Sequence, residues 1–194
     1  MIAASVHQTA PGSLFIISAP SGAGKTTLCE EIRKHYPDLV YSISYTTRPP
    51  RPAEQEGRDY FFITQPAFEK GIAEGRWAEW ANVHGYYYGT SARLVQNALD
   101  AGRSILMDID VQGARQMLTR FPGAVTIFIM PPSLDELKRR LLARGTDDDA
   151  TIAVRMQNAQ VEISQSGFYR HIIVNDDLEQ ARRAILAVFA QHLN

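Results

Sequence analysis

The chain has 194 residues, of which 45% are hydrophobic, so it is long enough to bury a sizeable core and has the composition of a globular protein. Its formal net charge of -1 provides no overall field to hold nucleic acid or an anionic membrane. We therefore expect neither as a partner, and any anion site must be built locally. The single cysteine, Cys29, excludes an internal disulfide and fits a reducing, cytoplasmic location.

No stretch approaches the ~20 apolar residues that a membrane span needs. Residues 1–12 are expected to form a flexible tail. Four short apolar runs then alternate with segments of helical periodicity, which is the pattern of an α/β protein with a largely parallel sheet. The expected strands are 14–18, 105–109, 125–130 and 171–174. No surface for self-association can be identified from the sequence.

The first expected strand runs directly into a glycine-rich loop and then into a helical segment. The loop has the sequence Ala19-Pro20-Ser21-Gly22-Ala23-Gly24-Lys25-Thr26. Backbone N–H groups of such a turn can surround a polyphosphate, while Lys25 reaches its β and γ oxygens and the Thr26 hydroxyl ligates Mg²⁺. The motif departs from GxxxxGK[ST] because Ala19 replaces the first glycine. The alternative is a flexible turn with an exposed lysine.

The composition of residues 41–89 differs from that of the flanking segments, because aromatics, arginines, prolines and turn residues replace the long apolar runs. We expect a substrate-specific subdomain inserted in the core. Within it, prolines flank Arg48 and Arg51 and stiffen the backbone, which favours presentation of two guanidinium groups to a phosphate. A solvated basic turn is the alternative interpretation.

The strand at 105–109 contains Asp108 near its end, where an acidic residue can associate with Mg²⁺, by direct ligation or through water. Asp108 could equally cap a helix that begins at Val111. Further along, Ser133 and Glu136 have the spacing of a capping box, which predicts a helix from Leu134 to about Arg144 that Gly145 ends.

The expected helix places Arg140 and Arg144 one turn apart on one face, and Arg155 follows after an acidic, polar segment suited to a mobile lid. A last helix is expected to begin near Asp177. One apolar stripe of this helix contains Leu178, Ala181, Ile185, Val188 and Phe189.

Transfer of a phosphoryl group between two nucleotides needs no general base, because the attacking phosphate oxygen is already anionic. Positioning and charge neutralisation suffice, and the chain offers a lysine and arginines for this while showing no evident triad or metal-ligand cluster. His84 and His171 are isolated in the sequence and are expected to have structural or surface roles.

Eight segments spread over most of the chain together resemble the guanylate kinase family, in the family's order. They are Ala-Pro-Ser-Gly-Ala-Gly-Lys at 19–25, Ser-Tyr-Thr-Thr-Arg at 44–48, Gly-Arg-Asp-Tyr-Phe-Phe at 57–62, Glu-Trp-Ala at 79–81, Tyr-Tyr-Gly-Thr at 87–90, Asp-Ile-Asp-Val-Gln-Gly at 108–113, Arg-Gly-Thr at 144–146 and Val-Asn-Asp-Asp at 174–177. The resemblance implies a P-loop nucleoside monophosphate kinase that transfers the γ-phosphoryl group of ATP to GMP or dGMP, with Mg²⁺, in purine nucleotide metabolism.

The resemblance also implies roles for individual residues. On the GMP side they are Arg48, Arg51, Tyr60 and Tyr88 for the phosphate, Ser44, Glu79 and Thr90 for guanine, and Gly89 and Asp110 beside the same pocket. On the ATP side they are residues 19–26, the lid arginines Arg140, Arg144 and Arg155, and Asn175 near the base. The expected catalytic set is Lys25, Arg48, Arg144 and Arg155, with Thr26 and Asp108 toward the metal.

The chemistry of guanine supports the role given to Glu79 independently. Guanine presents adjacent N1–H and N2–H₂ donors that one carboxylate can accept in a fork, whereas adenine has an acceptor at N1. Other interpretations remain open: Glu79 could lie on a surface helix, and Tyr60 and Tyr88 could be core aromatics. Phe168-Tyr169-Arg170-His171 departs from the family, which more often carries an acidic residue there, and this weakens any prediction of adenine contacts.

Two other functional classes compete with this prediction. Some domains of this fold have lost catalysis and bind proteins, but those usually show a damaged phosphate loop. A kinase for a phosphorylated sugar would not need the guanine set. The expected organisation is a domain at 13–194 with a core at 13–43, 93–139 and 159–194, a GMP-binding insertion at 44–92 and a lid at 140–158, which close over both substrates.

Overall fold

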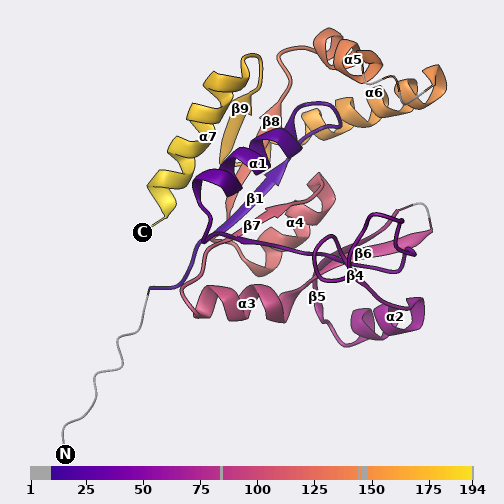
Figure 1. The fold of residues 1–194 in the computed structure, drawn as a ribbon, viewed down its shortest axis with the longest axis vertical. Helices are drawn as coiled ribbons and strands as arrows, with labels where there is room; N and C mark the ends of the chain where they lie inside the picture. The colour runs from indigo at the N-terminus through magenta and orange to yellow at the C-terminus, as the bar shows by residue number, and fades with distance from the viewer. Residues whose placement is uncertain (1–9, 84, 144, 146–147, 194) are drawn as a thin grey trace, which may run out of the picture.

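A parallel sheet forms the centre of the molecule. The computed structural model describes residues 10–83, 85–143, 145 and 148–193. Within these ranges five parallel strands form the central sheet in the order β2-β7-β1-β8-β9 (Figure 1). They are β1 (Leu14–Ser18), β2 (Val40–Tyr41), β7 (Ile105–Asp108), β8 (Val125–Met130) and β9 (His171–Val174). The four predicted strands are confirmed, although β7 ends one residue before Ile109.

Helices cover both faces of this sheet, which explains why its strands read as continuous apolar runs. Leu14 and Ile16 of β1 belong to a buried cluster that includes side chains of α3 (Ala92–Asp100) and α4 (Val111–Arg120). Phe15 and Ile17 belong to a second cluster, with α1 (Lys25–His35) and α7 (Leu178–His192). The expected α/β fold with a parallel sheet flanked by helices is therefore confirmed.

The predicted helix ends are largely confirmed. Helix α5 spans Leu134–Ala143, and the Glu136 amide donates to Ser133 Oγ at 3.1 Å as a capping box requires. Arg144 lies outside the described residues. Asp177 caps α7, but Leu178 in its first turn is exposed, so the buried stripe narrows to Ala181, Ile185 and Phe189.

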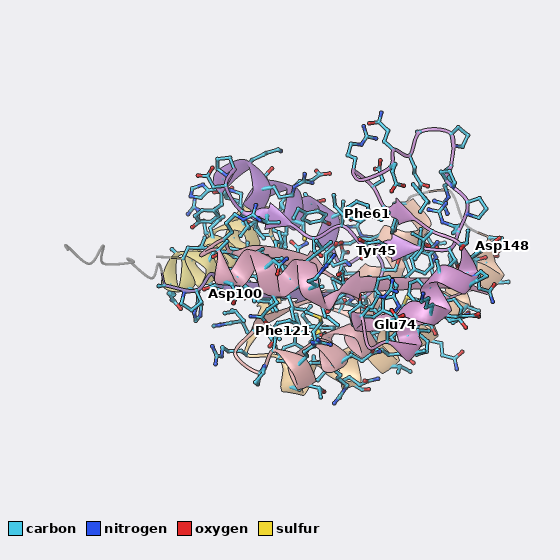
Figure 2. The ribbon with its side chains drawn as sticks, turned by 90° about the horizontal axis from the view of Figure 1, so that it is seen from below. Tyr45, Phe61, Glu74, Asp100, Phe121 and Asp148 are labelled. Carbon is cyan, nitrogen blue, oxygen red and sulfur yellow. The ribbon has the colours of Figure 1, made fainter. Side chains whose placement is uncertain are left out.

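A second, smaller sheet is built from residues between the first two long strands of the core. Its order is β4-β3-β6-β5, with strands β3 (Tyr45–Thr46), β4 (Phe61–Phe62), β5 (Trp77–Val83) and β6 (Tyr86–Ser91). Helix α2 (Gln65–Ala73) packs on one face, where Phe68 stacks on Trp77 with ring centroids 4.3 Å apart. Tyr45 and Phe61 lie side by side and join β3 to β4 (Figure 2). The sequence indicated an insertion here but not these strands.

The segment expected to form a mobile lid is largely helical. Helix α6 (Asp149–Ser164) follows α5 and is capped by Asp148, whose Oδ1 accepts from the Thr151 amide at 2.8 Å. A 3-10 turn, Ser166–Phe168, then leads to β9. Thr146 and Asp147 lie outside the described residues. In Figure 1 the α5–α6 pair and the second sheet extend from the same side of the core.

The fold also shows the environment of the cysteine and the character of the helices. Cys29 is 3% exposed, and burial raises the pKa of its thiol to about 12, so it is a small core residue, not a reactive thiol. In the part of the chain that the structure describes, no helix combines the length and apolarity needed to cross a membrane.

Candidate active site

The loop between β1 and α1 is shaped to receive an anion. Gly22 and Gly24 have φ angles of 92° and 96°, in the left-handed region that favours glycine. Gly24 is the N-cap of α1 and no side chain caps the first turn, so the helix presents its first amides and the positive end of its dipole to the loop. Residues 19–22 and 24–27 of the loop line a cavity of about 350 Å³ together with Glu162.

A side chain from the far end of the sheet fixes this loop. Asn175, which is 5% exposed and follows β9, donates from Nδ2 to the Ala23 carbonyl at 2.8 Å. A Cβ atom at Gly24 would collide with the same Asn175 amide. Asn175 therefore holds the backbone of the phosphate loop, a contact that the sequence did not indicate.

The loop lysine faces a carboxylate at the end of the neighbouring strand. Lys25 Nζ lies 3.2 Å from Asp108 Oδ2, and Tyr41 Oη donates to Asp108 Oδ1 at 2.5 Å. Burial, with the Asp108 charge as the next cause, raises the pKa of Tyr41 above its usual value, so the phenol remains a donor. Asp108 does not cap a helix: the N-cap of α4 is Asp110, so that alternative is wrong.

One of the predicted lid arginines contacts the loop from the α5–α6 side. Arg155 lies on α6 and donates from Nη1 to Ser21 Oγ at 3.1 Å. Arg140 lies on α5, with Nε 2.8 Å from Glu136 Oε1. The structure thus places Arg155 in contact with the phosphate loop, whereas Arg140 pairs with Glu136 of its own helix.

Glu162 is the acidic side chain among the described residues that line the phosphate-loop cavity. Burial raises the pKa of this carboxyl to about 7; repulsion by Asp110 adds to the shift and attraction by Lys25 opposes it. A half-buried carboxylate facing an anion-binding loop was not expected from the sequence, where the residue stands in an ordinary helical segment.

A second carboxylate is buried where the second sheet meets the start of α4. Glu79 on β5 is 7% exposed and its Oε1 accepts from Thr90 Oγ1 at 2.6 Å. Burial raises the pKa of Glu79 to about 7, while the Thr90 hydroxyl opposes the shift. A Cβ atom at Gly113 would lie 3.0 Å from Glu79 Oε2 and 3.3 Å from Asp110 Oδ1, so Glu79 and Asp110 meet over the start of α4. Glu79 is a strand residue, and the surface-helix alternative is wrong.

Basic and aromatic side chains gather at the end of β3, on the face of the second sheet that carries Thr90. Arg48 Nε donates to Tyr88 Oη at 3.2 Å, and its Cζ lies 5.6 Å from the centre of the Tyr60 ring. Both tyrosines are partly exposed, with ring centroids 5.9 Å apart. Arg51 is exposed in the same turn, and Ser44 is half-buried just before β3.

Gly89 is buried for reasons of packing. A Cβ atom there would meet the Glu79 carbonyl and the Phe68 ring, each at 2.9 Å. The absence of a side chain at Gly89 therefore lets β6 pair closely with β5. It also lets Phe68 of α2 pack on the face of the sheet opposite to the one that carries Thr90. A larger cavity of about 690 Å³ lies between α2 and α3, away from Lys25 and Glu79, and none of the predicted site residues lines it.

Comparison with known proteins identifies the family. The sequence model described as "Guanylate kinase" matches residues 12–192. The chain belongs to the guanylate kinase family. It is 51% identical to the guanylate kinase of Geobacter sulfurreducens over 177 residues, which cover 91% of this chain and 87% of that protein. It is 48% identical to the guanylate kinase of Dechloromonas aromatica over 177 residues, 91% of this chain and 88% of the relative.

A solved structure agrees with the assignment to the guanylate kinase family. The crystal structure of guanylate kinase from Anaplasma phagocytophilum matches with a TM-score of 0.71 at 33% identity, covering 95% of this chain and 88% of that one. Guanylate kinases are ATP:GMP phosphotransferases, so the chain belongs to a family of nucleotide kinases with the P-loop fold.

The residues expected from the guanylate kinase resemblance fall into two groups in space. One surrounds the phosphate loop and contains Lys25, Thr26, Asp108, Arg155 and Asn175; the other lies on the second sheet and α4 and contains Ser44, Arg48, Arg51, Tyr60, Glu79, Tyr88, Gly89, Thr90 and Asp110. Four residues at these sites were not expected from the sequence: Tyr41, Glu54, Gly113 and Glu162. Glu54 accepts hydrogen bonds from the Arg48 side chain and the Arg51 amide, in a turn that no sequence motif marks. The contacts of the other three depend on the packing of segments that are distant in the sequence.

Proposed function

We propose that this chain transfers the γ-phosphoryl group of ATP to GMP, and to dGMP, giving ADP and GDP or dGDP. The observation that carries the proposal is the pairing of an anion-binding loop bearing Lys25 with a buried carboxylate, Glu79, beside the Thr90 hydroxyl. A buried carboxylate needs donors, and the N1–H and N2–H₂ groups of guanine supply two in a fork. Adenine would leave Glu79 unpaired at its N1 position.

The reaction follows from the charges of the reactants. An anionic oxygen of the GMP phosphate forms a bond to the γ-phosphorus while the bond from that phosphorus to the ADP oxygen breaks. No general base is required, so the protein's work is to position two anions and to neutralise charge. We assign this to Lys25 and the loop amides on the ATP side and to Arg48 and Arg51 on the GMP side, with the arginines Arg144 and Arg155 of the lid.

Oxygen donors near the loop fit Mg²⁺. Thr26, whose hydroxyl is an oxygen donor, is among the residues that line the phosphate-loop cavity, and the Asp108 carboxylate lies at the end of β7 beside Lys25. Mg²⁺ prefers oxygen ligands and keeps several waters, and among the described residues no cluster of three or more His, Cys, Asp or Glu side chains could form an all-protein cage. We propose Thr26 as a ligand and Asp108 as a partner through water. When bound with ATP, Mg²⁺ supplies positive charge to the phosphate oxygens.

We further propose that the molecule works in three parts: the core, a GMP-binding insertion at 44–92 and a lid at 140–158. Arg140 and Asn175 would contribute to ATP binding, Arg140 from the lid and Asn175 through the loop that it holds. Ser44 would contact guanine beside Glu79 and Thr90, while Tyr60 and Tyr88 would share the GMP phosphate with the two arginines.

A coupled ADP-release assay tests the proposed reaction. Mg²⁺-ATP would be offered with GMP, dGMP, AMP, UMP or ribose 1,5-bisphosphate as separate acceptors. We expect rapid turnover with GMP and dGMP alone. Activity only with the sugar phosphate would overturn the acceptor, and no activity with any of the five would favour a protein-binding module instead.

A further inference from the structure

One carboxylate closes the turn that carries both phosphate-site arginines. Arg48 Nη2 donates to Glu54 Oε1 at 2.7 Å and to Oε2 at 3.0 Å, and the Arg51 amide donates to Glu54 Oε2 at 2.8 Å. The side chains of Arg48 and Glu54 are only 13% and 17% exposed. Glu54 therefore connects the guanidinium of one arginine to the backbone of the other.

The hydrogen bonds of Arg48 show what this arrangement leaves available. A guanidinium has five N–H groups. Nη2 directs an N–H at the two Glu54 oxygens, Nε donates to Tyr88 Oη, and Nη1 donates to the Pro49 carbonyl at 2.8 Å. Among the described residues these three partners fix the plane of the guanidinium, and the second N–H of Nη1 is available to a ligand.

Arg48 and Glu54 both stay ionised across the neutral pH range. Hydrogen bonding to Arg48 is the main cause that lowers the pKa of Glu54, and the same bond raises the pKa of Arg48 above its usual value. With Arg51, the turn carries one net positive charge beside the hydroxyls of Tyr60 and Tyr88. This net positive charge favours binding of a phosphate. The ion pair between Glu54 and Arg48 can therefore persist when a phosphate binds.

We infer that Glu54 is a positioning residue for the substrate phosphate: it holds Arg48 and the 48–51 turn in the geometry that binds the 5′-phosphate of GMP. The inference rests on the proposed function. Arginine loses rotamer freedom when it binds an anion, and a guanidinium that is already fixed loses less. The contrasting role would be competition, in which the Glu54 carboxylate occupies the place of the phosphate.

Glu54→Gln separates these roles, because it removes the charge and part of the hydrogen bonding with almost no change in size. The matched control is Glu56→Gln, two residues away, where an exposed carboxylate accepts from the Phe62 amide at 2.9 Å. Calorimetric titration would compare GMP with guanosine, which has the base and lacks the phosphate. We expect Glu54→Gln to weaken GMP binding about tenfold or more and to leave guanosine binding and the KM for ATP unchanged.

The other outcomes overturn the inference in distinguishable ways. Tighter GMP binding by Glu54→Gln would show competition. Equal losses for GMP and guanosine, or a thermal midpoint far below that of Glu56→Gln, would show that Glu54 only folds the turn. Unchanged GMP binding would remove any role for Glu54. If the unmodified protein binds neither ligand, the proposed function fails first and the inference falls with it.

Discussion

At the scale of single residues, the two acidic groups of the proposed GMP site lie in different environments. Glu54 is kept ionised by its ion pair with Arg48, whereas the Glu79 carboxyl is buried and accepts a hydrogen bond from the Thr90 hydroxyl. Burial raises the pKa of Glu79 to about 7. A ligand that offers two N–H donors to this carboxylate favours its ionised form, so guanine binding and loss of the proton should be coupled.

The raised pKa of Glu79 predicts a pH-dependent stability. Its usual value is 4.5, so between about 4.5 and 7 the unfolded chain has released a proton that the folded protein retains. Stability is then lost as the pH rises through this window and stays constant above it. Glu79→Gln should be more stable than the unmodified protein by up to about 3 kcal/mol at pH 8, with a difference that shrinks toward pH 5.

Urea unfolding from pH 5 to pH 8 measures this difference for Glu79→Gln. Glu69→Gln, at an exposed position on α2, serves as the control and should follow the unmodified protein at every pH. A difference that is the same at pH 5 and pH 8 would contradict the raised pKa. Glu79→Gln should also weaken GMP binding, while the KM for ATP remains unchanged.

Lys25 has the most direct role that we assign on the ATP side. Lys25→Ala should lower kcat by about 10³-fold or more, because one preorganised positive group at the transferring phosphoryl is lost. The control is Lys34→Ala on the same helix, whose side chain is 71% exposed and pairs with Glu31. The ADP-release assay with GMP measures both. Retention of most activity by Lys25→Ala would exclude the loop as the phosphate site.

At the scale of elements, the phosphate loop depends on more than its own strand and helix. The loop leaves β1, and the Asn175 amide that follows β9 binds its Ala23 carbonyl at 2.8 Å. Strands β1 and β9 are separated by β8 in the sheet. The position of the loop therefore also depends on how β9 packs and where it ends, which connects the last strand of the fold to the loop that we propose binds ATP.

Asn175→Ala should raise the KM for ATP about tenfold and leave the KM for GMP unchanged, since a buried carbonyl loses its donor and the loop loses a fixed point. Initial rates at varied ATP and at varied GMP separate the two effects. Asn97→Ala, at an exposed position on α3, should behave as the unmodified protein. Equal increases in both KM values would mean that Asn175 supports the whole fold and not the loop alone.

The elements also show how far the sequence could predict the structure. β1, β7 and β8 lie in the middle of the central sheet and are almost wholly buried, so their apolar runs were recognisable. β9 is an edge strand with Ile172 and Val174 exposed, and its short run of β-branched residues was still recognisable. β2, β3 and β4 have two residues each and exist through pairing with distant strands, so no local pattern marks them. The meeting of Glu79 with Asp110, and the bond from Arg48 to Tyr88, depend on the same long-range pairing.

At the scale of the whole molecule, the two sites that we propose for ATP and GMP lie on different structural units. The phosphate loop belongs to the core sheet, with Arg155 of α6 reaching it, while Arg48 and Tyr88 belong to the second sheet. Figure 2 places Asp148, the N-cap of α6, at the same end of the molecule as Tyr45 and Phe61 of the second sheet, and Figure 1 shows α6 and the second sheet on the same side of the core. A direct transfer requires the two anions to meet, so the units must approach each other when both are bound.

This approach can be measured with two fluorescent labels, one on each moving unit. Lys70→Cys places a label on exposed α2 and Ala153→Cys places one on exposed α6, in a Cys29→Ala background that removes the buried native thiol. We expect energy transfer to increase most when GMP and a non-hydrolysable ATP analogue are both present, and less with either alone. The charge-neutralising groups then assemble around the transferring phosphoryl only in the complete complex, from which water is excluded, so ATP hydrolysis without GMP should be slow.

A control pair on the core, Asp100→Cys with Gln180→Cys, should show no change. Equal signals for the α2–α6 pair under all four ligand conditions would show that the units are rigid, and phosphoryl transfer would then have to occur in the geometry described above.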